Sequence, residues 1–158
     1  MKFKNLALPY ELKPFFRSNH AGETGAIYIY KAIIKFSKDK RILKFAKKHL
    51  ETEKKHLELI EKILPKAEFS KLISLWKFFG FMTGFIPVLL GNNFVYTTIY
   101  YVETFVERHY KDQLLMLNGK TNTNDLQKLI HSLMNDEIDH KEDAENNIKK
   151  LKWYVFQE

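Results

Sequence analysis

The chain has 158 residues, of which 45% are hydrophobic, and it contains only 6 Gly and 4 Pro. This length suits one domain with a real core, and this composition argues against disorder and favours an all-helical protein. The chain has no cysteine, which excludes disulfides, thiolate zinc sites and iron–sulfur clusters and fits a reducing compartment. We therefore expect one all-α domain over residues 1–158.

The net charge of +7 is distributed unevenly along the chain. Residues 1–77 carry 18 Lys and Arg against 8 acidic residues, a balance of +10, whereas residues 78–158 carry 8 against 11, a balance of −3. A basic half of this kind can meet nucleic acid or anionic lipid, or it can be only a solvated lysine-rich surface. Met1 to Asn5 is basic, but no cleavable apolar segment follows it, so we expect no signal peptide.

Residues 12–37 are predicted to form the first helix, because apolar side chains recur on one side at helical spacing. Glu23 lies on this otherwise apolar side, between Gly22 and Gly25. A glycine inside a helix costs up to about 1 kcal/mol. Two of them beside Glu23 therefore suggest the close approach of another backbone or of a bulky ligand.

The second predicted helix is capped by Asp39 and stopped by Pro65. Its inward side repeats at steps of three and four residues, through Ile42, Ala46, His49, Glu53, His56, Ile60 and Ile63. Glu53 and His56 thus share one face that points into the core. A buried ionised carboxylate is costly unless an opposite charge compensates it, and a divalent metal would do so.

A stretch of 25 residues without any charge, from Phe78 to Val102, is long enough to pass as a membrane span. Gly, Pro and Asn residues interrupt it, so we predict a short apolar helix over 72–85, a break, and a bundle helix over 93–118 that carries Glu103. The short helix is richer in aromatic residues than a small core needs.

We expect residues 72–86 to contact a membrane surface peripherally, with Lys71 and Lys77 beside lipid headgroups. A buried crossover helix is the alternative.

The last predicted helix begins near Asn124 and carries a second Glu-x-x-His motif at Glu137 and His140, again within an apolar side. Each motif follows a lone inward Glu, at a distance of 30 residues in the first half and 34 in the second. The chain is thus an internal repeat of helix pairs. The candidate metal ligands are Glu23, Glu53, His56, Glu103, Glu137 and His140. Four Glu and two His on four helices are the ligand set of a carboxylate-bridged di-iron or di-manganese bundle, so we predict two metal ions, iron or alternatively manganese.

Several longer motifs then occur in a fixed order over nearly the whole chain. They are His20-Ala21-Gly22-Glu23-Thr24-Gly25-Ala26, Leu75-Trp76, Val102-Glu103, His109-Tyr110-Lys111-Asp112-Gln113, and Asp136-Glu137 with His140. With these motifs the chain resembles the demethoxyubiquinone hydroxylase family, the ferritin-like di-iron monooxygenases of ubiquinone biosynthesis. It departs from the family pattern at Arg17-Ser18-Asn19, at Ile33 and at Glu68-Phe69-Ser70, none of which is a candidate ligand.

The resemblance implies a ferritin-like four-helix bundle with an extra apolar helix in its crossover and a di-metal site in its core. It also implies hydroxylation of the ring of a demethoxyubiquinone-type polyprenyl quinone by O2. The electrons would come from an external donor, ultimately NADH, because the chain has no flavin or nicotinamide fingerprint. The expected location is peripheral, on the cytoplasmic face of a membrane.

The partners that we expect are the polyprenyl quinone, an anionic membrane surface and an external reductase or other biosynthetic proteins. A homo-oligomer is a further possibility, and we expect no nucleic-acid partner.

The candidate catalytic residues are Tyr110 and His109, which follow Glu103 by about two turns. Tyr110 could hydrogen-bond a ligand or relay protons and electrons, and an ordinary core tyrosine is an equal alternative. His20 and His49 lie close to candidate ligands in the sequence, but satisfied core histidines are the simpler interpretation.

Two other functions compete with the hydroxylase. A ferritin-type iron oxidase or storage protein would use a similar bundle, but a lipid-facing segment would be out of place in its cage. A di-iron hydroxylase acting on tRNA would suit the basic half, but the chain shows no basic and aromatic stacking pattern.

Overall fold

The computed structural model describes residue 6 and residues 8–155, with side chains up to residue 150. Within these residues the chain forms helices and no strands: short 3-10 turns at Tyr10–Leu12 and Lys66–Glu68, and the helices α1 (Lys13–Phe36), α2 (Lys40–Ile63), α3 (Ile73–Leu90), α4 (Asn92–Leu117) and α5 (Asn124–Val155). The all-α prediction is confirmed. The expectation about Met1 to Asn5 lies outside the described residues.

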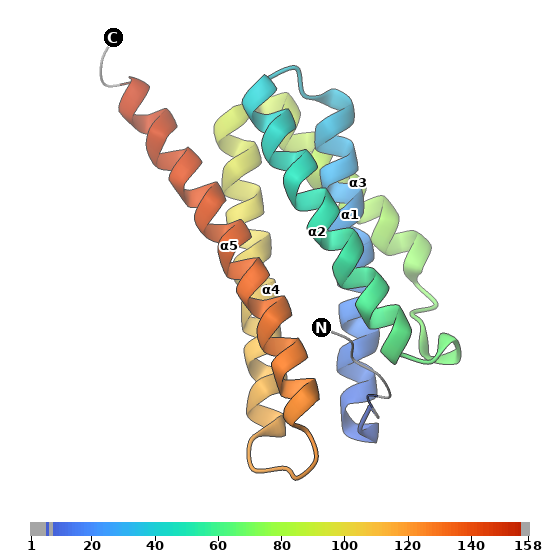
Figure 1. The fold of residues 1–158 in the computed structure, drawn as a ribbon. Helices are drawn as coiled ribbons and strands as arrows, with labels where there is room; N and C mark the ends of the chain where they lie inside the picture. Colours follow the sequence, from blue (N-terminus) through green and yellow to red (C-terminus); the bar gives the residue numbers. More distant parts are fainter. Residues whose placement is uncertain (1–5, 7, 156–158) are drawn as a thin grey trace.

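The four long helices form two antiparallel pairs, α1 with α2 and α4 with α5, while α3 lies against the outside of α1 (Figure 1). Buried apolar side chains form two clusters. One contains Ile33, Phe45 and Ile99, and the other contains Phe16, Ile60, Leu117 and Leu129. In all four long helices the candidate ligands come between the residues of these two clusters in the sequence. The site is therefore held between two apolar layers of the core.

The start of α2 is fixed by its predicted cap. The side chain of Asp39 accepts hydrogen bonds from the backbone N–H groups of Arg41, at 2.7 Å, and Ile42, at 3.3 Å. These bonds satisfy two of the amides that a helix leaves unpaired at its first turn. They set the start of the helix that carries Glu53 and His56 inward.

The predicted break is present but comes later than expected, because α3 continues past residue 85 to Leu90 and ends at Gly91, whose φ is +112°. Gly80, Gly84 and Pro87 are buried and recur on one face of α3. A Cβ atom on Gly80 would collide with the backbone carbonyl oxygen of Gly25, and one on Gly84 with that of Ile29. The residues that suggested a break instead allow α3 to pack closely against α1.

The two glycines beside Glu23 differ in role. Gly25 meets α3 through its backbone, as the sequence suggested, whereas a Cβ atom on Gly22 would meet nothing within 4 Å. Gly25 thus takes part in the packing of α1 against α3, although a Cβ atom on Gly25 itself would meet Trp76 only at an ordinary contact distance of 3.5 Å.

The tight backbone contact at Gly80 and the free space beside Gly22 predict opposite effects of alanine substitution on stability. Gly80→Ala should lower the free energy of unfolding by about 1–3 kcal/mol, because the new methyl group has only backbone to displace. The matched control Gly22→Ala should be neutral or stabilising by up to about 1 kcal/mol, since alanine favours the helix and has room. Urea unfolding of both variants measures this. Equal stability of the two variants would contradict the close contact between α1 and α3.

Candidate metal centre

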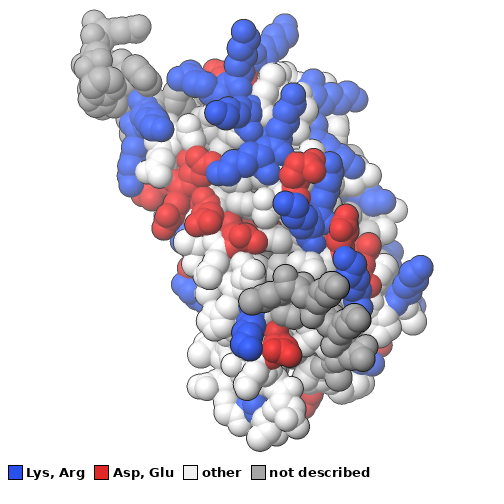
Figure 2. Space-filling view, in the orientation of Figure 1, with Lys and Arg blue, Asp and Glu red and all other residues white. Residues whose placement is uncertain are grey.

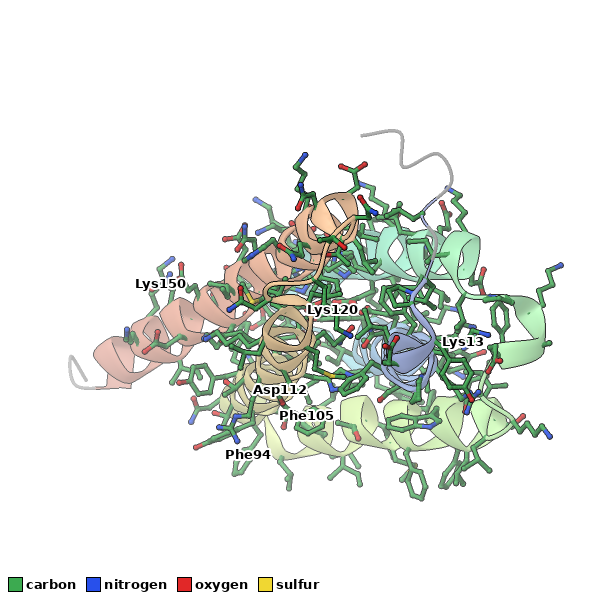
Figure 3. All side chains as sticks on the ribbon, turned by 90° about the horizontal axis from the view of Figure 1, so that it is seen from below. Lys13, Phe94, Phe105, Asp112, Lys120 and Lys150 are labelled. Carbon is green, nitrogen blue, oxygen red and sulfur yellow. The ribbon has the colours of Figure 1, made fainter. Side chains whose placement is uncertain are left out.

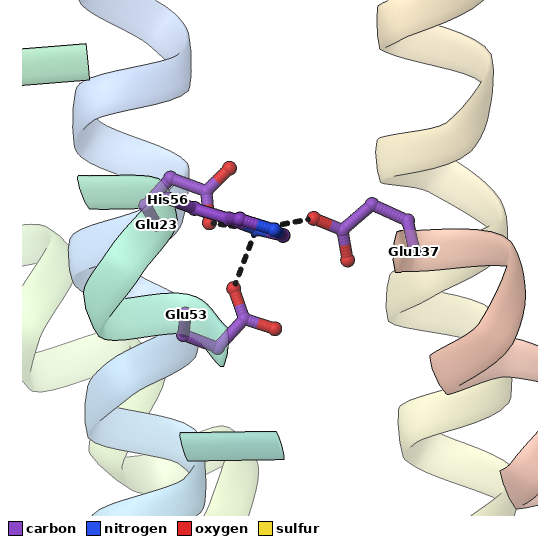
Figure 4. A group of neighbouring side chains, drawn as sticks. All are labelled: Glu23, Glu53, His56 and Glu137. Atoms are coloured by element: carbon purple, nitrogen blue, oxygen red, sulfur yellow. Dashed lines mark ion pairs between the residues drawn. The ribbon is translucent and has the colours of Figure 1, made fainter. Parts of the chain in front are cut away.

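Six buried side chains from four helices converge in the middle of the bundle. α1 supplies Glu23, α2 supplies Glu53 and His56, α4 supplies Glu103, and α5 supplies Glu137 and His140. They form two overlapping groups, Glu23, Glu53, His56 and Glu137, and Glu53, Glu103, Glu137 and His140. Within each group, one ligand atom per residue lies within 4.8 Å of all the others. Figure 4 shows the first group.

Glu53 and Glu137 belong to both groups, because each presents one carboxylate oxygen to each histidine. Oε2 of Glu53 lies 3.7 Å from Nδ1 of His56, and its Oε1 lies 3.0 Å from Nδ1 of His140. For Glu137, Oε1 lies 3.1 Å from Nδ1 of His56, and Oε2 lies 3.4 Å from Nδ1 of His140. If the cluster held two ions, both of these carboxylates could contribute to each of them.

Glu23 and Glu103 each approach only one histidine. Oε2 of Glu23 lies 3.5 Å from Nδ1 of His56, and Oε1 of Glu103 lies 3.8 Å from Nδ1 of His140. If the cluster held two ions, Glu23 and Glu103 would each contribute to only one of them.

Five buried atoms of this cluster have no hydrogen-bond partner among the described residues: Oε1 of Glu53, both carboxylate oxygens of Glu137, and Nδ1 of His56 and of His140. They lie at ion-pair distances from one another without forming hydrogen bonds, as expected for atoms arranged around a shared ligand. An unpaired buried polar atom costs about 1–3 kcal/mol. Two divalent ions would satisfy all five and balance four carboxylates, and oxygen and imidazole ligands suit iron or manganese. The donor set therefore fits the predicted metal pair, and the six residues stay our proposed ligands.

Hydrogen bonds from the surrounding helices hold the proposed ligands in place. Tyr110 donates its hydroxyl proton to Oε1 of Glu23, and Tyr30 donates to Oε1 of Glu103 at 2.7 Å. On the far side of the His56 ring, Nε2 lies 3.0 Å from Oδ2 of Asp136. The tyrosine bonds fix the orientation of the two carboxylates, and the Asp136 contact fixes the His56 ring and raises its basicity.

Tyr30 and Asp136 had no predicted role at the site. The repeat contained a signal for Tyr30, since it follows Glu23 by seven residues just as Tyr110 follows Glu103 by seven. Each tyrosine bonds the lone glutamate of the other half.

The remaining histidines lie at different distances from the cluster. The ring of His49 is 4.1 Å from that of His140, centroid to centroid, and its Nε2 lies 3.0 Å from Oδ2 of Asp143. His49 thus contacts a proposed ligand, contrary to the simpler interpretation. His20 stacks instead on Phe69, at 4.1 Å, outside both groups.

The buried carboxylates of the cluster favour the uptake of protons or of metal cations. Burial raises the pKa of Glu23 to about 7 and raises that of Glu103 well above its usual range. Burial alone would lower the pKa of His140, but the adjacent carboxylates of Glu137 and Glu53 outweigh it and raise the value to about 11. Without metal, the cluster therefore takes up protons, and an incoming metal must displace them.

This competition predicts how pH affects metal binding and stability. The pKa values of Glu23 and His140 in the fold lie above their ordinary values of 4.5 and 6.5. The stabilisation from their protons is therefore fully present at low pH and is lost as pH rises through about 7 for Glu23 and about 11 for His140. Metal affinity should rise with pH, by about tenfold per pH unit for each proton displaced.

We expect the difference in Tm between metal-loaded and metal-stripped protein to be larger at pH 8 than at pH 6. Glu53 and Asp136 have lowered pKa values and titrate below this window, so they should not reverse the trend. Thermal unfolding with and without Fe(II) under anaerobic conditions measures the difference. A stabilisation that is larger at pH 6 would contradict the assignment.

Comparisons with known proteins agree with the motifs. The family described as ubiquinone biosynthesis protein COQ7 matches residues 10–157, which include all six proposed ligands. A relative from Dictyostelium discoideum, named "NADPH-dependent 3-demethoxyubiquinone 3-hydroxylase, mitochondrial", is 29% identical over 131 residues, covering 78% of this chain. The chain covers 58% of the length of that relative. The predicted resemblance is thereby confirmed at the level of the family, and the chain belongs to the ubiquinone biosynthesis protein COQ7 family.

Proposed function

We propose that the protein is a di-iron monooxygenase that hydroxylates the ring of a demethoxyubiquinone-type polyprenyl quinone. Membership of the COQ7 family and the hydroxylase name of the relative support this reaction. The observation that carries the proposal furthest is an apolar cavity that ends on the carboxylate cluster. Neither iron storage nor tRNA modification calls for such a cavity.

The cavity has a volume of about 400 Å³ and lies between α1, α3 and α4. Glu23, Glu53, Glu103 and Glu137 line its inner end, and the remaining walls are mainly apolar. Its volume is typical of a small-molecule site. A quinone ring could therefore reach the proposed metal centre without meeting water.

Glycines and aromatic residues form the wall between the cluster and the surface. Gly22, Gly25 and Gly80 line the cavity, and so do Trp76, Phe79 and Phe105, which are all exposed. The small residues leave space for a ring between the helices, whereas the exposed aromatic residues suit an apolar tail that extends outward. We propose that the substrate enters along this wall.

Two iron ions, when bound, would exchange two electrons with O2 and so supply the oxygen-activating chemistry. In the balanced reaction, one oxygen atom becomes the ring hydroxyl group and the other becomes water, with two electrons and two protons supplied from outside. Tyr110 lines the cavity beside Glu23, and burial raises its pKa well above the usual range, so its hydroxyl keeps a proton at the site.

His109 lies in the cavity wall, and burial lowers its pKa, so its ring is neutral at pH 7. Its buried Nε2 has no hydrogen-bond partner in the described part of the chain. We propose that this ring orients an oxygen atom of the substrate, while Tyr110 positions Glu23.

The electron donor is proposed to be external and ultimately a reduced nicotinamide. The relative is named as NADPH-dependent, whereas the motif resemblance implied NADH. For this chain, the use of NADH stays a prediction.

The cavity mouth lies on a continuous apolar surface formed by α3 and α4. Its exposed residues include Leu75, Phe78, Ile86, Leu89, Leu90, Phe94, Tyr101 and Phe105. Figure 3 shows Phe94 and Phe105 on the side of the bundle where α3 lies. The surface extends beyond the predicted segment 72–86. Phe81 and Phe85 instead pack against Phe36.

In the described part of the chain, α3 is one helix that is long and apolar enough to cross a membrane, with a mean hydropathy of 1.6. We propose that α3 lies in the membrane surface instead. Its backbone contact with α1 at Gly80 and Gly84 holds it alongside a helix that carries charged residues such as Lys31 and Lys35. A spanning α3 would draw these charges into lipid at high cost. The relative is named as mitochondrial, and the cytoplasmic face stays a prediction for this chain.

The proposed reaction is tested by a pair of substitutions on α4. Glu103→Gln should reduce hydroxylation of a demethoxyquinone by about 100-fold or more, because it removes a proposed ligand while keeping the shape of the side chain. Glu107→Gln is the matched control, since Glu107 lies one turn further on and pairs with Lys111 and Lys141 instead of facing the cluster. Product formation under O2, with an external reductant, is measured after iron loading.

The control variant should keep most of the wild-type rate. Hydroxylation that survives Glu103→Gln, or that falls equally in both variants, would contradict the proposed role of the cluster.

The membrane proposal predicts that exposed apolar residues of α3 control lipid binding. The triple substitution of Phe78, Leu89 and Leu90 by Ser should strongly reduce sedimentation with liposomes, since it removes apolar area without touching the cavity wall. The wild type should also be released from membranes by alkaline carbonate. Retention after carbonate would indicate a spanning helix, and unchanged sedimentation of the variant would place the contact elsewhere.

A further inference from the structure

A second cavity, separate from the apolar one, lies between the start of α2, the start of α4 and the second half of α5. It has a volume of about 740 Å³. Figure 1 shows the last turns of α5 leaning away from α2 and α4 at this end of the bundle. Lys and Arg side chains gather over the same end in Figure 2. Nothing in the proposed hydroxylase reaction uses this cavity.

The cavity carries a surplus of positive charge. Arg41, Lys44, Lys48 and Lys150 line it, against one carboxylate, that of Asp143. Arg41 is paired with Asp39, 3.4 Å away. The side chain of Lys48 lies 3.0 Å from Asp143, so that pair is balanced. Lys44 and Lys150 form no ion pair with any described side chain. Cations gathered around a cavity repel one another and create a positive potential that attracts anions.

Tyr96 forms part of the wall of the cavity. Tyr96 is only 3% exposed and packs edge-to-face on Phe45, with 5.1 Å between the ring centroids. Its hydroxyl makes no hydrogen bond with the described residues, so it is available to a ligand in the cavity. Burial, together with the charge of Asp39, raises the pKa of Tyr96 to about 12. Its hydroxyl therefore keeps its proton and can donate it to a ligand.

We propose that this cavity binds a soluble, phosphate-bearing molecule of about nucleotide size. Phosphate oxygens would accept a hydrogen bond from Tyr96 and ion pairs from the lysines, as in other phosphate sites. The volume is within the range of small-molecule sites. Anionic lipid would supply the same chemistry, but the cavity is formed by α2, α4 and α5, and α2 and α5 lie on the side of the bundle opposite α3 (Figure 3). The choice of a soluble source thus rests on α3 being the membrane-contacting helix.

The test compares two double substitutions with the same loss of charge. Lys44→Gln with Lys150→Gln removes two cations from the cavity, whereas the control, Lys47→Gln with Lys149→Gln, removes neighbouring cations of the same two helices that do not line it. Binding of pyrophosphate and of ADP is measured by calorimetry at about 150 mM salt, where distant charges are largely screened. We expect saturable binding to the wild type, a Kd raised about tenfold in the first variant, and a nearly unchanged Kd in the control.

Tyr96→Phe provides an independent measurement, since it removes only the hydroxyl group. It should weaken pyrophosphate binding severalfold while leaving the fold intact by circular dichroism.

Three results would overturn the proposal. Absence of saturable binding would do so, and so would an equal loss in both double variants, which would indicate diffuse electrostatic attraction. Equal binding by all three proteins would place the phosphate elsewhere, for instance at the metal centre, which both variants leave unchanged. Phosphatidylglycerol vesicles form a separate arm: binding to vesicles that depends on Lys44 and Lys150, without binding of pyrophosphate, would identify a lipid source instead. Failure of these tests would leave the hydroxylase proposal unaffected, because they do not measure turnover.

Discussion

Four buried carboxylates in the middle of a small helical bundle are the constraint on which the rest of the structure depends. Glu23, Glu53, Glu103 and Glu137 are all at most 3% exposed, and ions removed from water in this way are strongly destabilising unless they are compensated. Two histidines and two tyrosines supply part of that compensation. Oxygen atoms of Glu53 and Glu137 that accept no hydrogen bond from the described residues are the positions where added positive charge would help most. Stability and the proposed chemistry therefore depend on the same six side chains.

The internal repeat explains the symmetry of the site and also its one clear asymmetry. The two halves exchange contacts, because Tyr30 bonds Glu103 and Tyr110 bonds Glu23. His56 is supported by Asp136 from the other half. The residue that occupies the position of Asp136 in the first half, 84 residues earlier, is Thr52. The ring of His140 packs instead on His49, which Asp143 holds, so the two halves of the site have different surroundings.

Much of this arrangement could be predicted from the sequence, because helical periodicity and charge burial act locally. The inward positions of Glu53 and His56, the cap at Asp39 and the pairing of the two halves all follow from spacing along the chain. The length of α3 did not follow. Gly80, Gly84 and Pro87 are helix breakers by local preference, and only the backbone of α1, more than fifty residues away in the chain, shows why they are tolerated. The contact of His49 with His140 and the cavity beside Tyr96 also depend on how separate helices meet, which spacing within one helix does not specify.

The central claim is that Glu53 and Glu137 bridge two metal ions inside one chain. It is tested most directly by iron analysis combined with electron paramagnetic resonance of anaerobically loaded and partly oxidised protein. The account predicts about two irons per chain and a spin-coupled signal, because two carboxylates shared between two ions hold them close together. One iron per chain, with the signal of an isolated high-spin ferric ion, would contradict it.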